Sequence, residues 1–352
     1  MAAGIRGARR AVVTALAVVL LGGCGTPVDL LAGGLEPAAA VPTVAPVTTP
    51  PPPPTVPWPL TGVPTTDPVL RPALSVKVEN SPDARPQTGL GQADVVWEQV
   101  VEGGISRFVA VYQSQVPAEI GPVRSTRPMD PAITAPVGGL FATSGGQAQY
   151  VDAEAEAGLQ VFTFDAGDAG FYRVDTRDAP HNVHLAPQAL YDAADEAHRG
   201  APAAQFGYSG TPTATVQGTP TAAVDLELSR VATPTWTWSA PDGAWLRAEG
   251  TEPSVGADGV ALRATNVVTL RVRVVATDAT DPAGNPVPET LLDAEGGEAL
   301  IATGGSTVVA TWSKAGTGDP VVLTGPDGAP VTLAPGTTWV ELVPGTGSVT
   351  TR

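Results

Sequence analysis

The chain has a single cysteine, Cys24, among its 352 residues, and this scarcity excludes several chemistries. Without any further thiol, the folded part contains no disulfide framework, no cysteine nucleophile and no cysteine metal site. An exported domain that lacks disulfides must be held together by its hydrophobic core. A folded part of roughly 300 residues is long enough to bury such a core.

Basic residues are also scarce. The chain has 19 Lys and Arg against 35 Asp and Glu, for a formal charge of −16. So acidic a protein is expected to be repelled by nucleic acid and by anionic lipid surfaces, and we predict no nucleic-acid partner. Attachment to a membrane would have to come from acyl chains.

Recognisable catalytic and cofactor motifs are missing. The sequence has no phosphate loop, no dinucleotide fingerprint, no metalloprotease motif and no repeat of fixed period, and we predict no cofactor. Ser144-Gly145-Gly146 lacks the Gly-x-Ser-x-Gly pattern of a nucleophile elbow. His181 and His184, with Asp178 nearby, form an incomplete set of zinc ligands, so no metal site is predicted.

The first residues are typical of an export signal. Arg6, Arg9 and Arg10 precede an apolar run over residues 11–21. This run is shorter than the roughly 20 residues needed to cross a bilayer, and it indicates a removed signal peptide over residues 1–23. The run ends in Leu21-Gly22-Gly23-Cys24, which resembles the bacterial lipobox. That resemblance implies cleavage before Cys24 and diacylglyceryl modification of its sulfur.

After cleavage, the loss of three arginines and no acid would change the formal charge from −16 to −19. Residues 24–57 are rich in Pro, Ala, Thr and Val and include the run Pro50 to Pro54. Such a chain favours extended polyproline II, and we interpret it as a disordered tether. No second long apolar run follows, so the remainder is expected to be soluble. The sequence thus predicts a cell-membrane lipoprotein, anchored on the extracytoplasmic face through acyl chains on Cys24.

The folded part is predicted to be α+β. Residues 58–205 are expected to form a layered sheet-and-helix half, with strands over 73–79, 94–101 and 107–112 and helices over 150–159 and 187–198. Residues 206–352 are expected to be mostly β, because short β-branched stretches recur between turn signals such as Pro-Asp-Gly. The two halves could form one continuous unit or two lobes. The predicted strands in the second half are 224–231, 236–238, 267–276, 307–312, 321–323 and 338–342.

Several motifs after the tether carry a family resemblance. They are Pro-Leu-Thr-Gly at 59–62, Arg-Pro-Ala-Leu at 71–74, Asn-Ser-Pro-Asp-Ala-Arg-Pro-Gln-Thr-Gly-Leu-Gly-Gln-Ala at 80–93, Val-Glu-Gly-Gly-Ile-Ser-Arg-Phe at 101–108, Gly-Pro-Val-Arg-Ser at 121–125, Ala-Pro-His-Asn at 179–182, Lys314 and Pro-Gly-Thr-Thr-Trp at 335–339. On these motifs the chain resembles the YerB-like bacterial lipoproteins, a family classed as a domain of unknown function.

The resemblance implies a lipid-anchored envelope protein with a layered α+β fold, and it implies no reaction, substrate or cofactor. Two places depart from the family pattern. Trp97-Glu98-Gln99 stands where the family usually has Tyr-Glu-Glu, and Val183-His184 stands where it usually has Leu-Tyr. The resemblance therefore implies no role for Gln99 or for the side chain of His184.

Basic side chains gather in short, turn-rich segments of the first half. Arg107, Arg124 and Arg127 could bind an anionic group, because arginine presents a planar, permanently charged fork. Asn182, beside His181, is a further candidate ligand-binding residue. The same charges could equally pair with carboxylates and hold loops to the sheet.

Acid–base chemistry has its own candidates. Glu98 and Glu102 are four residues apart on a predicted strand, where alternation would place both on one face. With His181 they form the candidate catalytic set.

Three functions therefore remain open on the sequence. The first is a non-enzymatic envelope protein that binds an anionic or glycan ligand or a partner protein. The second is an acid–base hydrolase acting on cell-wall or glycolipid material, and the third is a structural spacer.

Overall fold

The computed structural model describes residues 54–352. The predicted signal peptide, Cys24 and nearly all of the tether lie outside the described residues. Residues Pro53–Arg352 form one compact unit. Within the described part, no helix combines the length and apolar character needed to span a bilayer.

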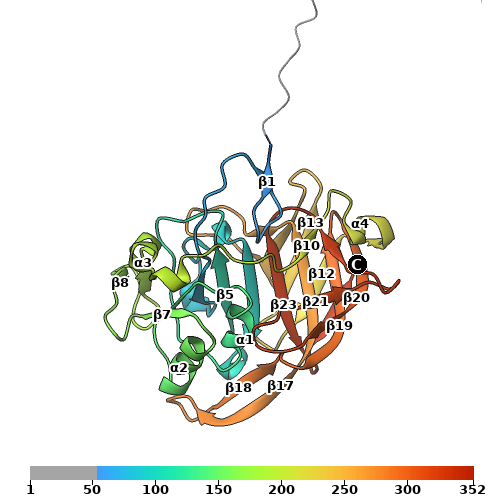
Figure 1. The fold of residues 1–352 in the computed structure, drawn as a ribbon. Helices are drawn as coiled ribbons and strands as arrows, with labels where there is room; N and C mark the ends of the chain where they lie inside the picture. Colours follow the sequence, from blue (N-terminus) through green and yellow to red (C-terminus); the bar gives the residue numbers. More distant parts are fainter. Residues whose placement is uncertain (1–53) are drawn as a thin grey trace, which may run out of the picture. The chain divides into compact units, whose positions relative to one another are not determined.

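A twelve-stranded sheet forms the centre of this unit (Figure 1). Its strands run in the order β11 (Thr219–Pro220), β20 (Ser306–Lys314), β19 (Glu295–Thr303), β17 (Asn266–Thr280), β23 (Thr338–Pro344), β4 (Val95–Val100), β5 (Ser106–Tyr112), β3 (Leu74–Glu79), β6 (Leu140–Thr143) and β7 (Gln160–Thr163). Beside this row, β18 (Pro286–Leu291) pairs with β17 and β21 (Val322–Thr324) pairs with β20.

The two halves of the sequence join inside this sheet. β23 pairs in parallel with β4 on one side and with β17 on the other. In Figure 1 the red strand β23 accordingly lies between the teal N-terminal strands and the orange C-terminal strands. β3, β5 and β23 are buried along their whole length. β5 and β23 are accordingly largely apolar, whereas the charged residues of β3, Lys77 and Glu79, are buried with ion-pair partners.

A second sheet of six strands packs on one face of the large sheet. It contains β15 (Glu252–Pro253), β14 (Ala244–Glu249), β13 (Pro234–Ser239), β12 (Ala223–Glu227) and β24 (Ser348–Thr351), with β16 (Arg263–Ala264) beside β14. Trp236 and Trp245 of this sheet share one core with Phe108 and Trp339 of the large sheet. The ring of Trp339 meets those of Phe108 and Trp236 edge to face. These contacts form a sheet-on-sheet core.

Three small ribbons and several short helices complete the fold. The ribbons are β1 (Val56–Pro57) with β2 (Pro64–Thr65), β8 (Phe171–Arg173) with β9 (Val183–Leu185), and β10 (Gly207–Tyr208) with β22 (Thr332–Leu333). The α-helices are α1 (Asp130–Thr134), α2 (Ala148–Glu156), α3 (Pro187–Ala193) and α4 (Thr213–Gln217), and the 3₁₀ turns are η1 (Pro82–Ala84), η2 (Leu90–Gln92), η3 (Glu102–Gly104) and η4 (Glu196–His198).

The chain is mostly β with few helices, and the prediction of a mostly β C-terminal half is confirmed. The predicted layered sheet-and-helix N-terminal half is met only in part, because its helices are short and its strands belong to the sheet shared with the C-terminal half. The predicted helix over 187–198 is too long. Ala194 has ψ 129°, and the Asp195 side chain then accepts from two backbone N–H groups and starts η4.

Candidate functional site

Charged side chains gather where β3 ends, β4 ends and β5 begins. Strand register pairs Arg107 with both Glu79 and Gln99, so these three side chains share one face of the sheet. Alternation directs Glu98 and Ser106 to the opposite face, where the six-stranded sheet packs. The same strand ends therefore carry two polar clusters, one on each face.

The first cluster contains three arginines and is called the arginine cluster: Arg107, Arg124 and Arg127. The segment 121–127 lies beside β3, since the backbone N–H of Arg124 donates to the carbonyl of Lys77 at 2.8 Å. Arg107, from β5, donates through Nη1 to the carbonyl of Ser125 at 2.8 Å. The predicted gathering of these arginines is therefore present, and all three come from the N-terminal half.

 

The three arginines differ in how many contacts each makes with carboxylate oxygens. Arg127 forms a two-pronged ion pair with Glu102, at 2.7 Å from Nε and 2.8 Å from Nη2, and its Nη1 donates to the carbonyl of Thr126. Arg124 meets a single carboxylate, with its Nε 3.3 Å from Oε1 of Glu79. Nε and Nη2 of Arg127 thus both bind Glu102. In contrast, the Nη groups of Arg124 have no hydrogen-bond partner among the described residues.

Arg107 lies among like charges. Burial, followed by the nearby charges of Arg127 and Arg124, lowers the pKa of its guanidinium to about 9. Its Nε is buried without a hydrogen-bond partner. Three arginines thus share two carboxylates, those of Glu79 and Glu102, and the cluster keeps one surplus positive charge.

One buried carboxylate oxygen, Oε1 of Glu79, contacts both the arginine cluster and His181. Oε1 of Glu79 lies 2.9 Å from Nδ1 of His181 and also accepts from the hydroxyl of Ser81 at 2.9 Å. The Glu79 side chain is only 1% exposed, whereas those of Arg124 and His181 are 21% and 24% exposed. Nδ1 faces the carboxylate, and Nε2 of His181 makes no hydrogen bond within residues 54–352, with Oδ2 of Asp83 4.0 Å away.

His181 opens onto a surface hollow, called the histidine hollow, with a volume of about 720 Å³. Arg177 in this hollow donates to the backbone carbonyls of Asp83 and Pro86, and so holds the turn around η1 in place. The hollow is lined by Asp83, Arg85, Thr176, Arg177, Asp178, Ala179 and His181.

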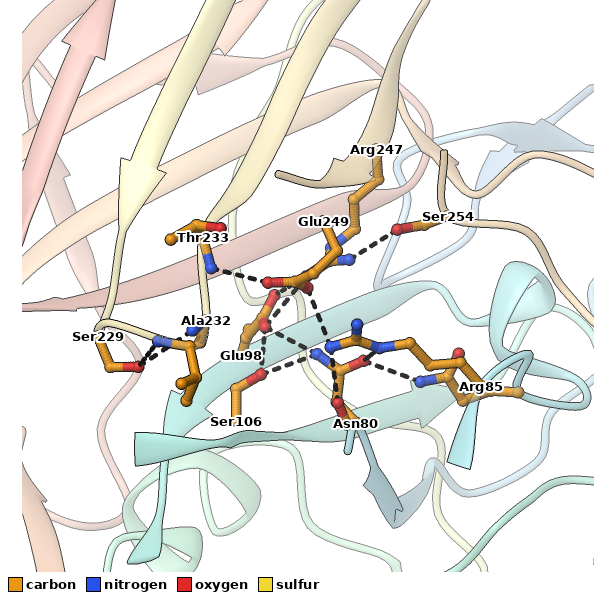
Figure 2. Close-up of polar contacts among 12 residues, drawn as sticks. Asn80, Arg85, Glu98, Ser106, Ser229, Ala232, Thr233, Arg247, Glu249 and Ser254 are labelled. Carbon is orange, nitrogen blue, oxygen red and sulfur yellow. Dashed lines mark hydrogen bonds and ion pairs between the residues drawn. The ribbon is translucent and has the colours of Figure 1, made fainter. Parts of the chain in front are cut away.

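The second cluster lies on the opposite face and is closed (Figure 2). Glu98 is fully buried and forms an ion pair with Arg247 of β14 at 2.8 Å. It also accepts from Asn80 at 3.1 Å and from the Ser106 hydroxyl at 2.5 Å. Arg247 in turn reaches Glu249 at 3.0 Å. This network connects the N-terminal strands with the six-stranded sheet.

Arg85 lies between the two clusters. Its Nε donates to Oδ1 of Asn80 at 3.0 Å, and its Nη2 lies 3.3 Å from Glu249. It lines the histidine hollow and also a smaller cavity of about 230 Å³. That cavity is bordered by Asn80, Arg85, Pro86, Gln87, Arg247, Glu249, Glu252, Pro253, Ser254 and Val255.

The expectation that Glu98 and Glu102 share one strand face is wrong. β4 ends at Val100, and Glu102 belongs to the turn η3, in which Gly103 has a φ of 69°. Glu98 pairs with Arg247 on one side of the sheet, and Glu102 pairs with Arg127 in the arginine cluster. The chain turn that follows the strand breaks the alternation on which the expectation depended.

The remaining candidates lie as follows. Asn182 accepts from Arg173 at 2.6 Å and donates to the carbonyl of Val174, which ties together the β8–β9 ribbon. Nδ1 of His184 lies 2.6 Å from Glu119, so His181 and His184 have different carboxylate partners. Over residues 54–352, no group of three or more His, Cys, Asp or Glu side chains is arranged to hold a metal ion.

Sequence reasoning missed Glu79, Arg85, Arg247 and Glu341. Three of them carry a recognisable signal, since Glu79, Arg247 and Glu341 are charged residues in strands that also contain large apolar residues. A charge at such a position must find a partner when the strand is buried. Their partners come from distant strands, however, and the sequence alone does not give that pairing.

Comparison with known proteins agrees with these motifs. Residues 60–200 match the family model described as "Protein of unknown function (DUF3048) N-terminal domain", and residues 224–340 match the corresponding C-terminal domain. "Putative lipoprotein YerB" from Bacillus subtilis (strain 168) is 36% identical over 142 residues, which cover 39% of this chain and 42% of that protein. The aligned part therefore spans less than half of that relative.

A crystal structure with a similar fold has been solved. The crystal structure of the YerB protein from Bacillus subtilis matches with a TM-score of 0.71 and 23% identity, over 84% of this chain and 99% of that chain. At this identity the likeness shows the fold alone. From the two domain matches and the related sequence, the chain belongs to the YerB-like family of proteins of unknown function.

Proposed function

We propose that this chain is a lipid-anchored cell-envelope protein that binds the anionic group of an envelope ligand, such as an acidic glycan, at Arg124 and His181. The observation that carries the proposal is the shared contact of both side chains with Oε1 of Glu79. Because Glu79 lies in ion-pair contact with Nε of Arg124 and binds Nδ1 of His181, it orients both side chains and leaves the Nη groups of Arg124 and Nε2 of His181 without partners among the described residues.

The local charge supports the same conclusion. The arginine cluster keeps a surplus positive charge within a chain whose formal charge is −16. Burial, and then repulsion from Arg127 and Arg124, lowers the pKa of Arg107, and an anion placed among the cations would relieve that repulsion. A carboxylate or sulfate-like group would accept charge-assisted hydrogen bonds from the Arg124 fork and, when the imidazole is protonated, from Nε2 of His181.

Binding fits the geometry better than hydrolysis. Glu98 is enclosed with Arg247, and Glu102 is held by both prongs of Arg127. Neither carboxylate is free to exchange a proton with a substrate, so the predicted catalytic set is reduced to His181. An anion-binding role uses His181 and Arg124 in the arrangement that the structure gives them.

Membrane attachment is proposed from the sequence. Leu21-Gly22-Gly23-Cys24 follows a basic start and a short apolar run, and the related Bacillus protein is named a putative lipoprotein. Replacing Cys24 by serine is expected to move the chain from the membrane fraction to the soluble fraction and to abolish incorporation of labelled palmitate. Equal membrane recovery of both forms would contradict the lipid anchor.

The anion site is tested by calorimetric titration with sulfate, whose charge is constant across the useful pH range. Arg124→Gln removes the free fork and is expected to weaken sulfate binding by at least about tenfold, as the loss of a charge-assisted hydrogen bond requires. Arg263→Gln is the matched control, because Arg263 is an exposed arginine with one carboxylate partner, Asp242, at 3.3 Å. Equal affinities in the Arg124→Gln and Arg263→Gln proteins would contradict the proposed site.

A further inference from the structure

Two buried glutamates meet where the halves of the chain join. The register of β4 and β23 places Glu341 directly beside Glu98, and both side chains are fully buried. Both face the six-stranded sheet, since Glu98 contacts Arg247 and Glu341 contacts Trp236. Two adjacent carboxylates in such a place repel each other strongly unless one of them is protonated.

The hydrogen-bond donors identify the ionised member of the pair. Glu98 receives donors from Asn80, Ser106 and Arg247, so it is well stabilised as a carboxylate. Glu341 receives only the indole N–H of Trp236, at 2.8 Å from its Oε1.

The second oxygen of Glu341 completes the assignment. Its Oε2 is buried and has no donor. A protonated Oε2 would itself donate to Glu98 and satisfy both groups. Burial, followed by the charge of Glu98, raises the pKa of Glu341 well above its ordinary value, and the hydrogen bond to Glu98 acts in the same direction.

The surrounding charges leave no cation for a second carboxylate. Arg247 is shared by Glu98 and Glu249, and Arg85 reaches Glu249 from the other side at 3.3 Å. With Glu341 neutral, the two arginines balance Glu98 and Glu249. Ionisation of Glu341 would add an unbalanced negative charge in the core, beside the indole N–H of Trp236.

We propose that the β4–β23 junction is pH-sensitive: Glu341 holds a proton that it donates to Glu98, and loss of this proton weakens the attachment between the two halves of the chain. The direction of the Glu341 pKa shift determines how stability changes with pH. A carboxyl that titrates higher in the folded than in the unfolded chain contributes stability that is complete at low pH. That contribution is lost as the pH rises through the folded-state titration.

The test compares Glu341→Gln with the parent protein in the full chain. Glutamine imitates the protonated acid, because its amide oxygen accepts from Trp236 and its N–H donates to Glu98. Both proteins carry Glu154→Gln, which removes a second buried carboxyl whose pKa is also raised. Glu298→Gln on strand β19 of the same sheet is the control for an exposed glutamate. The readouts are the thermal midpoint and the indole N–H resonance of Trp236, assigned by its loss in Trp236→Phe.

As the pH rises above the ordinary range of a glutamate, the parent midpoint is expected to fall, and the Glu341→Gln midpoint to fall by less than half as much. The Trp236 resonance should move with pH in the parent and stay fixed in Glu341→Gln. Equal pH dependence in both proteins, or a Trp236 resonance that does not move in the parent, would overturn the proposal. Failure of Glu341→Gln to fold would also contradict it, since glutamine supplies the same hydrogen bonds.

Discussion

At the scale of single residues, the supply of hydrogen-bond donors decides which buried acids are charged. Asp130 accepts from Lys77 at 2.6 Å, from the Arg127 backbone at 2.9 Å and from the side chains of Thr126 and Gln99. Glu154 accepts only from two threonine hydroxyls, at 2.7 and 3.4 Å. Asp130 is therefore suited to the ionised form and Glu154 to the neutral form, as in the pair of Glu98 and Glu341.

Glu154 gives a prediction at this scale. Burial, then the charge of Asp130, raises its pKa to about 8 in the folded protein from an ordinary 4.5. Its contribution to stability is complete below about pH 4.5 and is lost as the pH rises through about 8. Glu154→Gln is therefore expected to flatten the decline in the free energy of unfolding over this range, by up to about 1.4 kcal/mol per pH unit.

Denaturant unfolding at a series of pH values measures this effect. Glu156→Gln is the control, because Glu156 is an exposed glutamate on the same helix, α2. The assignment of a neutral Glu154 fails if Glu154→Gln and Glu156→Gln show the same pH slope.

At the scale of elements, the alternation of apolar and polar residues identified the strands, but it did not identify the structural reason why each strand ends. The predicted strands over 73–79, 94–101 and 107–112 correspond to β3, β4 and β5, each within one or two residues. Alternation could not show that β4 stops at Val100, because the turn η3 depends on the positive φ of Gly103 and Gly104. The turn η3 therefore places Glu98 and Glu102 on different sides of the sheet, so the predicted catalytic residues do not lie together.

The β4–β23 pairing predicts how the halves behave apart. Residues 58–205 alone contain Glu98 but neither β23 nor Arg247. An unpaired buried carboxylate costs about 3–5 kcal/mol, so this fragment is expected to show no cooperative unfolding transition. Co-expression with residues 206–352 should restore one, as judged by circular dichroism during heating. A cooperative transition of the isolated fragment, near that of the full chain, would show that the junction is dispensable.

At the scale of the whole molecule, the sequence could predict a β-rich second half and the gathering of Arg107, Arg124 and Arg127. It could not predict that the chain's last long strand lies beside a strand of the first half, because that pairing joins residues more than 200 positions apart. For the same reason, the sequence could not predict that Arg247 of β14 is the ion-pair partner of Glu98. The long-range pairing places an open, basic cluster and a closed, proton-sharing network on opposite faces of one sheet.

The most direct test of the proposed anion site observes the histidine itself. The chain has three histidines, so selective labelling of their imidazole nitrogens gives three pairs of signals, from Nδ1 and Nε2 of each ring, in a sulfate titration followed by NMR. His184 and His198 are internal controls, since each pairs with a carboxylate outside the arginine cluster, Glu119 and Asp195. The account predicts a saturable shift of the His181 signals that is lost in Arg124→Gln, with the other two histidines unchanged. Signals of His181 that do not respond, or that respond no more than those of His184 and His198, would contradict it.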